Sequence, residues 1–331
     1  MLAFVGELMS QGLSLDRPLW QMYVINNFGD GAAVVVQIHH AVADGFALVY
    51  LMLALADDVS EVELPIGEPP VLPDELEELE PEHAAHAGWK LALDITAALV
   101  DESVRTFHEP DRAVDAAKVS GKAAAALGRL LTLSEEPETS LTGELTTQKT
   151  AAWSEGVPLE PLKEVAREFG GTLNDLLMSA LTGAVRRYLE EGGEEVAGLN
   201  LRSIVPVNLR PLDERTAELG NQFGLVFLSL PVGIDDPKAR MRELKRRMDE
   251  LKHSPEAYVT YATLRTLGTM PLEVQEAFVS LFRDKATFIV TNMPGPTSRV
   301  PFLGQPIDDI MFWVPQSQGV GVGLSIFSYN G

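Results

Sequence analysis

The sequence predicts an α/β fold in which short strands alternate with helices. Runs rich in β-branched and aromatic residues, such as residues 199–208 and 221–232, have the composition and length of strands. The segments between such runs carry apolar residues three and four positions apart, which is the spacing of amphipathic helices. There is no internal repeat, and a hydrophobic content of 46% over 331 residues is enough for one large or two ordinary domains.

The N-terminal region is predicted to contain a helix, a hairpin and a second helix. The opening pattern LAFVGELMSQGL is typical of an apolar helix. The runs WQMYVINNF and AAVVVQIHH are joined by Gly-Asp-Gly, a combination that predicts two antiparallel strands and a tight turn. A second helix is then expected over residues 45–57.

The middle of the chain divides it into two lobes. Residues 57–82 contain eleven acidic residues and five prolines but neither Lys nor Arg, so we expect a solvated linker. Helices are predicted over residues 88–107 and 111–133, and the polar residues 134–150 are typical of a crossover between domains. We therefore expect a first lobe over residues 1–133, a crossover over residues 134–150 and a second lobe over residues 151–331.

The second lobe is predicted to alternate helices and strands. The helix over residues 237–252 has a regular pattern, because its apolar residues form one stripe opposite seven basic residues. The stripe consists of Met241, Leu244, Met248 and Leu251. Other helices are expected over residues 159–169 and 172–191 and in two segments after residue 252, and strands over residues 199–208, 221–232, 286–296, 310–315 and 321–331.

Composition excludes several classes of function. The net charge of −22 disfavours nucleic acid as a partner, because nucleic-acid binding draws on clustered Lys and Arg. Without cysteine there are no disulfides, thiolate metal sites or thiol nucleophiles, and nothing requires an oxidising compartment. The N-terminus lacks the basic region of a signal peptide, and the longest apolar run, residues 46–56, is too short to cross a bilayer. We expect a cytoplasmic protein that is soluble or peripheral.

Two adjacent histidines, His39 and His40, end the second predicted strand and are followed by Asp44 and Gly45. Successive side chains of a strand point to opposite faces, so one histidine is expected to do chemistry and the other to be structural. The same geometry disfavours metal binding, and we predict no metal site. The alternative is two ordinary histidines beside an aspartate that caps the next helix.

The choice of chemistry is narrow because several common catalytic motifs are absent. The chain has no cysteine, no Ser in a G-x-S-x-G elbow and no glycine-rich phosphate loop. A histidine can instead act as a general base that activates the hydroxyl or amine of a bound substrate. Such a reaction needs a second substrate with a good acyl leaving group, and it forms no covalent enzyme intermediate.

The stretch HHAVADG, residues 39–45, matches the H-H-x-x-x-D-G motif of the acyl-CoA-dependent acyltransferase superfamily. Within that superfamily, the chain resembles the bacterial bifunctional wax ester synthase/diacylglycerol acyltransferases. The resemblance implies a two-lobed fold similar to that of chloramphenicol acetyltransferase, with mixed sheets, flanking helices and an active-site channel between the lobes. It spans nearly the whole chain and includes five further stretches in the family's order: RPLW at residues 17–20, NDLLMSAL from Asn174, VPVNLRP from Val205, GNQFG from Gly220 and TNMPGP from Thr291.

By this resemblance, His40 is the catalytic base that takes the proton of an acceptor hydroxyl, and His39 supports the site. Asp44 is expected to pair with Arg210 of the other lobe, since a guanidinium suits a partly buried carboxylate. The alternative for Arg210 is an ordinary surface arginine. Gly45 is expected to leave room for a close backbone approach at the site.

Four further residues are expected to bind substrate. Asn174 and Asp175 open a helix that lies beside the site in the family, although helix capping also explains both. Asn292 is a candidate for positioning the substrate or stabilising an oxyanion. Trp20 is either a wall of the acyl pocket or a core aromatic residue. The basic face of the helix over residues 237–252 is either solvated or attracts the phosphates of CoA or an anionic membrane.

The resemblance implies transfer of a fatty acyl group from acyl-CoA to a long-chain alcohol or diacylglycerol, without a cofactor and with peripheral association at a membrane or lipid droplet. Two alternatives stay open: an acyltransferase of mycolipid or condensation type with a carrier-protein donor, and an inactive lipid-surface or scaffold protein. Family members carry segments before the RPLW region and after the TNMPGP region, so we expect this chain to be a fragment that exposes sheet edges and apolar surface.

Overall fold

The computed structural model describes residues 1–57, 128–130, 132–209, 220–280, 282–316 and 319–331, and it confirms the mixed α/β class. The helices described are α1 (Leu2–Ser10), α2 (Gly45–Ala54), α7 (Leu159–Glu168), α8 (Leu173–Glu191), α9 (Pro237–Lys252), α10 (Glu256–Leu267) and α11 (Leu272–Ser280). The strands described are β1 (Trp20–Phe28), β2 (Gly31–Ile38), β3 (Leu201–Asn208), β4 (Phe223–Leu230), β5 (Phe288–Pro294), β6 (Pro301–Phe302), β7 (Gln305–Pro306) and β8 (Val322–Ser328). The acidic linker from residue 58 onward and the helices predicted over residues 88–107 and most of 111–133 lie outside the described residues.

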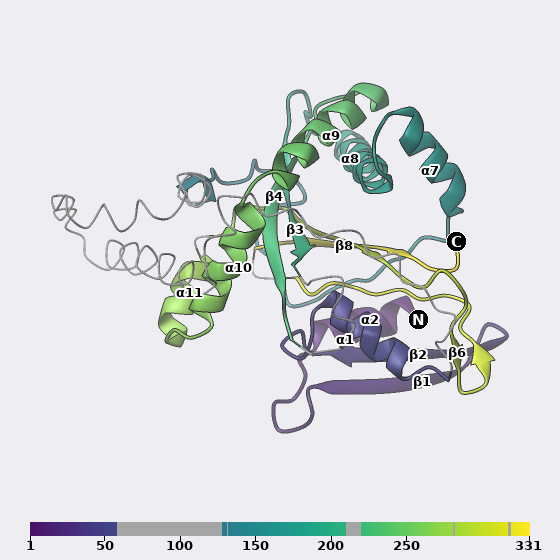
Figure 1. Cartoon of the computed structure of the whole chain (residues 1–331). Helices are drawn as coiled ribbons and strands as arrows, with labels where there is room; N and C mark the ends of the chain where they lie inside the picture. Colours follow the sequence, from purple (N-terminus) through teal and green to yellow (C-terminus); the bar gives the residue numbers. More distant parts are fainter. Residues whose placement is uncertain (58–127, 131, 210–219, 281, 317–318) are drawn as a thin grey trace.

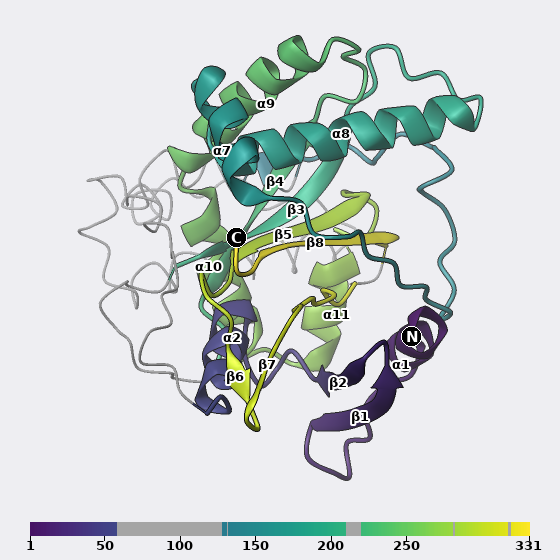
Figure 2. The same cartoon turned by 90° about the vertical axis from the view of Figure 1, so that its right-hand side faces the viewer.

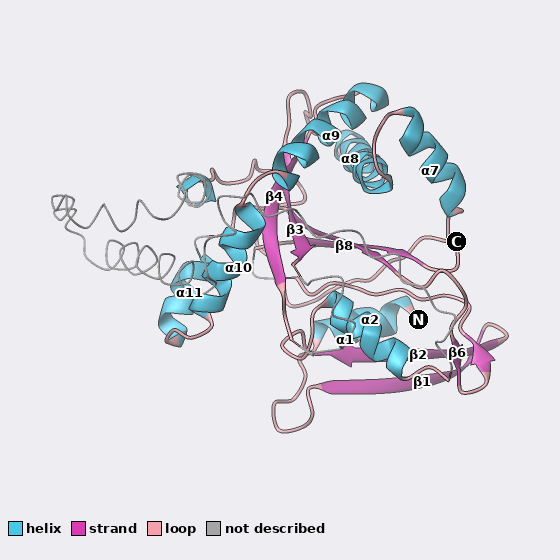
Figure 3. Cartoon of the chain, in the orientation of Figure 1, coloured by secondary structure: helices cyan, strands magenta, loops and turns pink. Residues whose placement is uncertain are grey.

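A four-stranded mixed sheet, in the order β4-β3-β5-β8, forms the centre of the molecule. β3 runs antiparallel to β4 and parallel to β5, and β5 runs parallel to β8. Helices α7, α8 and α9 lie on one side of this sheet, while α1, α2 and the β1–β2 hairpin lie on the other side (Figures 1 and 2). The sheet therefore separates two layers that contain helices (Figure 3).

The main core lies between the central sheet and helices α8 and α9. Of the stripe predicted on α9, Met241, Leu244 and Met248 are buried, and Leu251 packs against the same core. Each fully buried Leu, Val, Phe or Met side chain contributes about 1.5–3 kcal/mol relative to an exposed one. The buried members of this core are Met178, Val185, Leu189, Val196, Leu201, Leu228, Leu230, Val232, Leu244, Met248, Phe288 and Val290.

The predicted hairpin is confirmed, since β1 and β2 pair antiparallel around a turn with a positive φ angle at Gly29, and Asn27, where the register of β1 shifts, also has a positive φ angle. α1 covers one face of the hairpin, where the ring of Phe4 meets the ring of Tyr23 edge-on with 5.4 Å between centroids. The opposite face exposes large apolar side chains, and Val24 is 63% exposed. The exposed apolar residues of this face are Trp20, Met22, Val24, Val34 and Val36.

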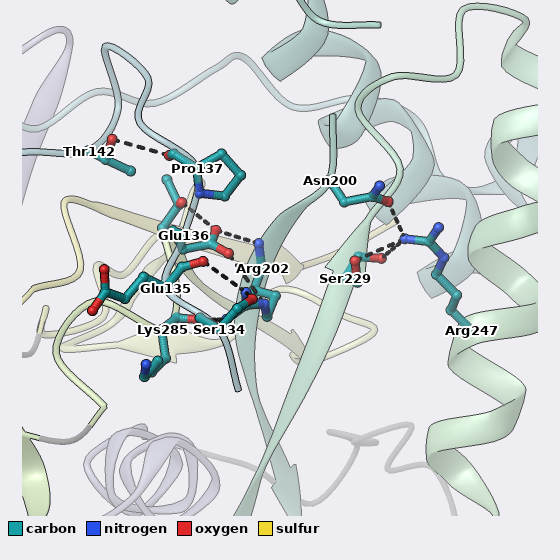
Figure 4. Close-up of polar contacts among 11 residues, drawn as sticks. Ser134, Glu135, Glu136, Pro137, Thr142, Asn200, Arg202, Ser229, Arg247 and Lys285 are labelled. Atoms are coloured by element: carbon teal, nitrogen blue, oxygen red, sulfur yellow. Dashed lines mark hydrogen bonds and ion pairs between the residues drawn. The ribbon is translucent and has the colours of Figure 1, made fainter. Parts of the chain in front are cut away.

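A polar network joins the crossover, which contains neither helix nor strand, to the central sheet (Figure 4). The Glu136 Oε2 atom accepts hydrogen bonds from the backbone N–H of Arg202 at 2.6 Å and from Thr287 Oγ1 at 2.7 Å. The guanidinium of Arg202 donates to the backbone carbonyls of Ser134 and Lys285. Burial raises the pKa of the Glu136 carboxyl, although the hydrogen bonds from Arg202 and Thr287 oppose that rise.

The strand predicted over residues 310–315 is wrong, because this segment forms neither helix nor strand. A Cβ atom built at Gly323 of β8 would contact Val314, so the segment crosses the face of β8 instead of pairing with its edge. Trp313 meets the ring of Trp153 edge-on, with 5.9 Å between centroids, and this contact fixes the segment. The short β6–β7 pair is an element that the sequence pattern does not predict.

Candidate active site

The two histidines lie in the turn between β2 and α2. The backbone N–H of Val42 donates to the His39 carbonyl at 2.9 Å, which closes this turn. The ring of His39 is used locally, since its Nδ1 atom accepts from the backbone N–H of Ala41 at 3.1 Å. His39 is exposed and His40 is half-buried, so the neighbours have different surroundings, although both lie beyond the end of β2 and the strand alternation does not apply to them.

The ring of His40 contacts the segment that leads into β4. Its Nδ1 atom lies 3.1 Å from Asn221 Oδ1, and Asn221 Nδ2 donates to the His40 backbone carbonyl at 3.1 Å. The ring of Phe223 meets the imidazole edge-on, with 5.9 Å between centroids and 64° between planes. Residues far apart in the sequence, from the regions predicted as the first and second lobes, therefore meet at His40.

Asp44 joins the same two segments. Its Oδ1 atom caps α2 by accepting from the Ala47 N–H at 3.0 Å, and its Oδ2 atom accepts from the Gln222 N–H at 2.9 Å. The Asp44 backbone N–H donates to the Gly220 carbonyl at 3.0 Å. The side chain is 4% exposed, so both carboxylate contacts are shielded from water. Arg210 lies outside the described residues, and its pairing with Asp44 stays a prediction.

Gly45 lies against the TNMPGP stretch, and the group that approaches it is the end of the Met293 side chain, whereas the predicted approach was of backbone. A Cβ atom at Gly45 would lie 2.8 Å from Met293 Cε, a distance that forces the methionine side chain to shift. Met293 is buried in a cluster with Val49 and Leu53 of α2 and with Val300. The close approach thus lets an apolar contact hold β5 against the helix that follows the histidine turn.

Asn174 and Asn292, both predicted to bind substrate, lie in contact with each other. Asn292 Nδ2 donates to Asn174 Oδ1 at 2.8 Å, which joins the start of α8 to β5. Asp175 has a capping role: its Oδ2 atom accepts from the Thr172 N–H at 2.7 Å and from Thr172 Oγ1 at 2.8 Å. Asp175 is fully buried, so capping explains its position, while contact of these residues with substrate stays a prediction.

Trp20 is the first residue of β1 and pairs with Ile38, directly before the histidine turn. Its side chain is 54% exposed on the apolar face of the hairpin. Within the part of the chain that the structure describes, Trp20 is therefore not a core aromatic residue. The acyl-pocket role of Trp20 stays a prediction.

Four of the seven basic residues of α9 form ion pairs with acidic residues of the same helix. Arg246 and Arg247 both bind Glu243, at 2.8 and 2.7 Å, and Lys245 binds Asp249 at 2.5 Å. Hydrogen bonds from these arginines lower the pKa of Glu243 to about 2. Arg240 departs from the predicted solvated face, because it is 8% exposed and donates to backbone carbonyls. These ion pairs are what the solvated-face interpretation expects, but the helix has seven basic and only three acidic residues, so attraction for phosphates stays a prediction.

A hollow of about 590 Å³ lies at the other end of the sheet from His40. It is lined in part by Arg247, which donates to Asn200 and to Ser229 of β4 (Figure 4). Phe223 and Ser229 are six residues apart on one strand, a distance of about 20 Å at ~3.3 Å per residue. This hollow is therefore separate from the histidine turn.

Sequence reasoning assigned no role to Asn221 and Phe223, although both lie in the GNQFG stretch that supports the family resemblance. Their contact with His40 depends on how two distant segments meet, and no local pattern encodes that contact.

Among the helices described, none combines the length and the apolar character needed to cross a bilayer.

Comparison with known proteins matches one family to both segments that meet at this site. Residues 1–177 match the wax ester synthase/diacylglycerol acyltransferase catalytic domain, and residues 219–331 match the C-terminal domain of the same family. A Mycobacterium tuberculosis protein described as a diacylglycerol O-acyltransferase is 32% identical over 80% of this chain, which spans 53% of that relative's length. A second M. tuberculosis protein with the same description is 23% identical over 98% of this chain and 67% of its own length.

The fold is shared with a solved structure. The wax ester synthase/diacylglycerol acyltransferase of Marinobacter aquaeolei VT8 superposes with a TM-score of 0.55 at 17% identity, over 99% of this chain and 68% of that one. The two domain models together match most of the sequence, and the H-H-x-x-x-D-G turn lies within the catalytic one. This chain belongs to the wax ester synthase/diacylglycerol acyltransferase family.

Proposed function

We propose that this protein transfers a fatty acyl group from acyl-CoA to the hydroxyl of a long-chain alcohol or diacylglycerol, giving a wax ester or triacylglycerol. His40 acts as the general base. As the hydroxyl oxygen attacks the thioester carbonyl, the imidazole takes its proton, and a tetrahedral intermediate forms. The C–S bond then breaks, and the imidazolium returns the proton to the departing CoA thiolate. The reaction uses acyl-CoA as a substrate and needs no cofactor.

The observation that supports this proposal best is the convergence of three motif stretches on one turn. His40 and Asp44 contact the GNQFG stretch through Asn221 and Gln222. Gly45 lies against Met293 of the TNMPGP stretch. A half-buried histidine at such a junction is held in place while part of its ring stays open to a bound molecule. That arrangement suits a base that acts on the substrate and forms no bond to the acyl group.

The acceptors in this proposal are lipid-soluble, because long-chain alcohols and diacylglycerol carry extended apolar chains. We therefore also propose that the protein acts in the cytoplasm at the periphery of a membrane or lipid droplet. Sedimentation with diacylglycerol-containing vesicles tests this part separately from turnover.

The experiment measures CoA release from a fatty acyl-CoA with hexadecanol and with diacylglycerol as acceptors. The His40→Ala variant should lose about 10²–10⁴-fold in rate, because it lacks the base. His39→Ala is the matched control and should lose less, since the His39 ring bonds within its own turn. Equal rates for the His40 variant and the unmodified protein would exclude this mechanism.

Two further results separate the alternatives. Turnover of a carrier-protein thioester without turnover of free acyl-CoA would favour the condensation-type reaction. After incubation with acyl-CoA alone, mass spectrometry should show the unmodified chain, and a stable acyl adduct would contradict direct transfer.

A further inference from the structure

We infer that Asn221 is a positioning residue that fixes which ring nitrogen of His40 carries the proton. This inference rests on the proposed function, in which His40 is the base. Neutral imidazole has one N–H donor and one bare nitrogen, and only the bare nitrogen can accept a proton. A contact that selects the tautomer therefore determines which ring nitrogen can act as the base.

The geometry of the Asn221 amide determines the tautomer. Asn221 Nδ2 lies 3.1 Å from the backbone carbonyl of His40, and a carbonyl oxygen can only accept a hydrogen bond. The amide nitrogen must therefore face that carbonyl, which leaves the amide oxygen facing the ring. Asn221 Oδ1, at 3.1 Å from His40 Nδ1, can itself only accept, so Nδ1 carries the hydrogen. The bare nitrogen is then Nε2, on the far side of the ring from Asn221.

The position of Asn221 is itself set by Asp44. The residues on both sides of Asn221 bind this aspartate, because Gly220 accepts from the Asp44 N–H and Gln222 donates to the Asp44 carboxylate. Asn221 is thus held at its two backbone neighbours while its amide spans the ring and the carbonyl of His40. This arrangement gives a physical reason for the spacing between the histidine and the aspartate of the motif.

The same contact serves both protonation states of the base. When Nε2 takes the proton of the acceptor hydroxyl, both ring nitrogens carry hydrogen, and Nδ1–H continues to donate to Asn221 Oδ1. The ring does not have to turn between the two states.

Two substitutions test the inference by different readouts. Asn221→Ala removes the tautomer preference and should lower kcat by about 10-fold, the equivalent of one ordinary hydrogen bond, with little change in KM. Asn221→Asp places a negative charge beside Nδ1 that favours the protonated imidazole, so the acid limb of the pH–rate profile should move to higher pH. Asn200→Ala is the matched control, since Asn200 lies beside the hollow at the other end of the sheet.

A spectroscopic measurement keeps the test independent of turnover. When the imidazole of His40 is neutral, its ¹⁵N shifts in the intact chain should show protonated Nδ1 and bare Nε2, and Asn221→Ala should give a mixture of tautomers. The inference is overturned if Asn221→Ala keeps the original tautomer, kcat and pH profile while His40→Ala is inactive. If His40→Ala keeps full activity, the proposed function fails instead, whatever the Asn221 variants do.

Discussion

The central sheet and the β1–β2 hairpin carry similar sequence patterns but differ in burial. In β4, alternate residues from Gly224 to Leu230 are buried against neighbouring helices. In the hairpin, the alternate apolar residues of one face, from Trp20 to Val36, are exposed. Apolar residues at alternate positions therefore identify a strand and its two faces. The alternation does not show which face another layer of the protein covers.

The candidate active site lies where these two regions meet. His40 follows the hairpin, and Asn221 directly precedes β4 of the central sheet. Asp44 holds the two segments together by accepting from the Gln222 N–H and donating its own N–H to Gly220, whereas the apolar face of the hairpin is exposed. We therefore expect that a few polar contacts fix the position of the hairpin region. The stability of the central sheet should instead come from burial of its apolar core.

Loss of Asp44 should give the largest effect on stability. Asp44→Ala removes a helix cap, which costs about 0.5–2 kcal/mol, and also leaves the Gln222 N–H without its carboxylate, which costs about 1–3 kcal/mol more. Asp236→Ala is the matched control, because Asp236 caps α9 through Ala239 and is exposed. Urea unfolding of both variants measures the difference. Equal losses would mean that the contact with Gln222 adds nothing to the cap.

A matched pair of valines should give the next largest effect. Val226→Ala in β4 removes two buried methyl groups from a residue that is 5% exposed, at about 0.8 kcal/mol each plus a cavity term. Val24→Ala in the hairpin makes the same change at a residue that is 63% exposed and should cost within about 0.5 kcal/mol. A loss above 1 kcal/mol for Val24→Ala, measured by thermal unfolding, would show that something covers the hairpin face in solution.

Much of this fold follows from local sequence signals. The apolar stripe over residues 237–252 predicts α9 with its observed bounds, and the Gly-Asp-Gly turn predicts the hairpin with its correct partners. The segment over residues 310–315 could not be placed, because its composition fits a strand but its pairing depends on the space beside β8. Asn221 was missed for the same reason: its contact with His40 joins residues 181 positions apart.

The smallest expected effect lies on the outer face of α9, away from both the core and the site. Glu243 binds Arg246 and Arg247, and these contacts lower its pKa from 4.5 to about 2. Because the pKa falls on folding, the contribution to stability is present above pH 4.5 and is lost as pH falls through that value toward 2. Solvent screens such pairs, so Glu243→Gln should cost at most about 1 kcal/mol at pH 7.

The pH dependence of that small loss distinguishes the ion pairs from packing of the same side chain. The free energy of unfolding of Glu243→Gln should differ from that of the unmodified protein at pH 7, and the difference should shrink as pH falls toward 2, where the carboxyl of the folded protein is about half protonated. Added salt should reduce the difference at pH 7, because these charges lie near the surface. A difference that is the same at both pH values would show that Glu243 acts through its packing. The solvated-face interpretation of α9 would then lose the support of these ion pairs.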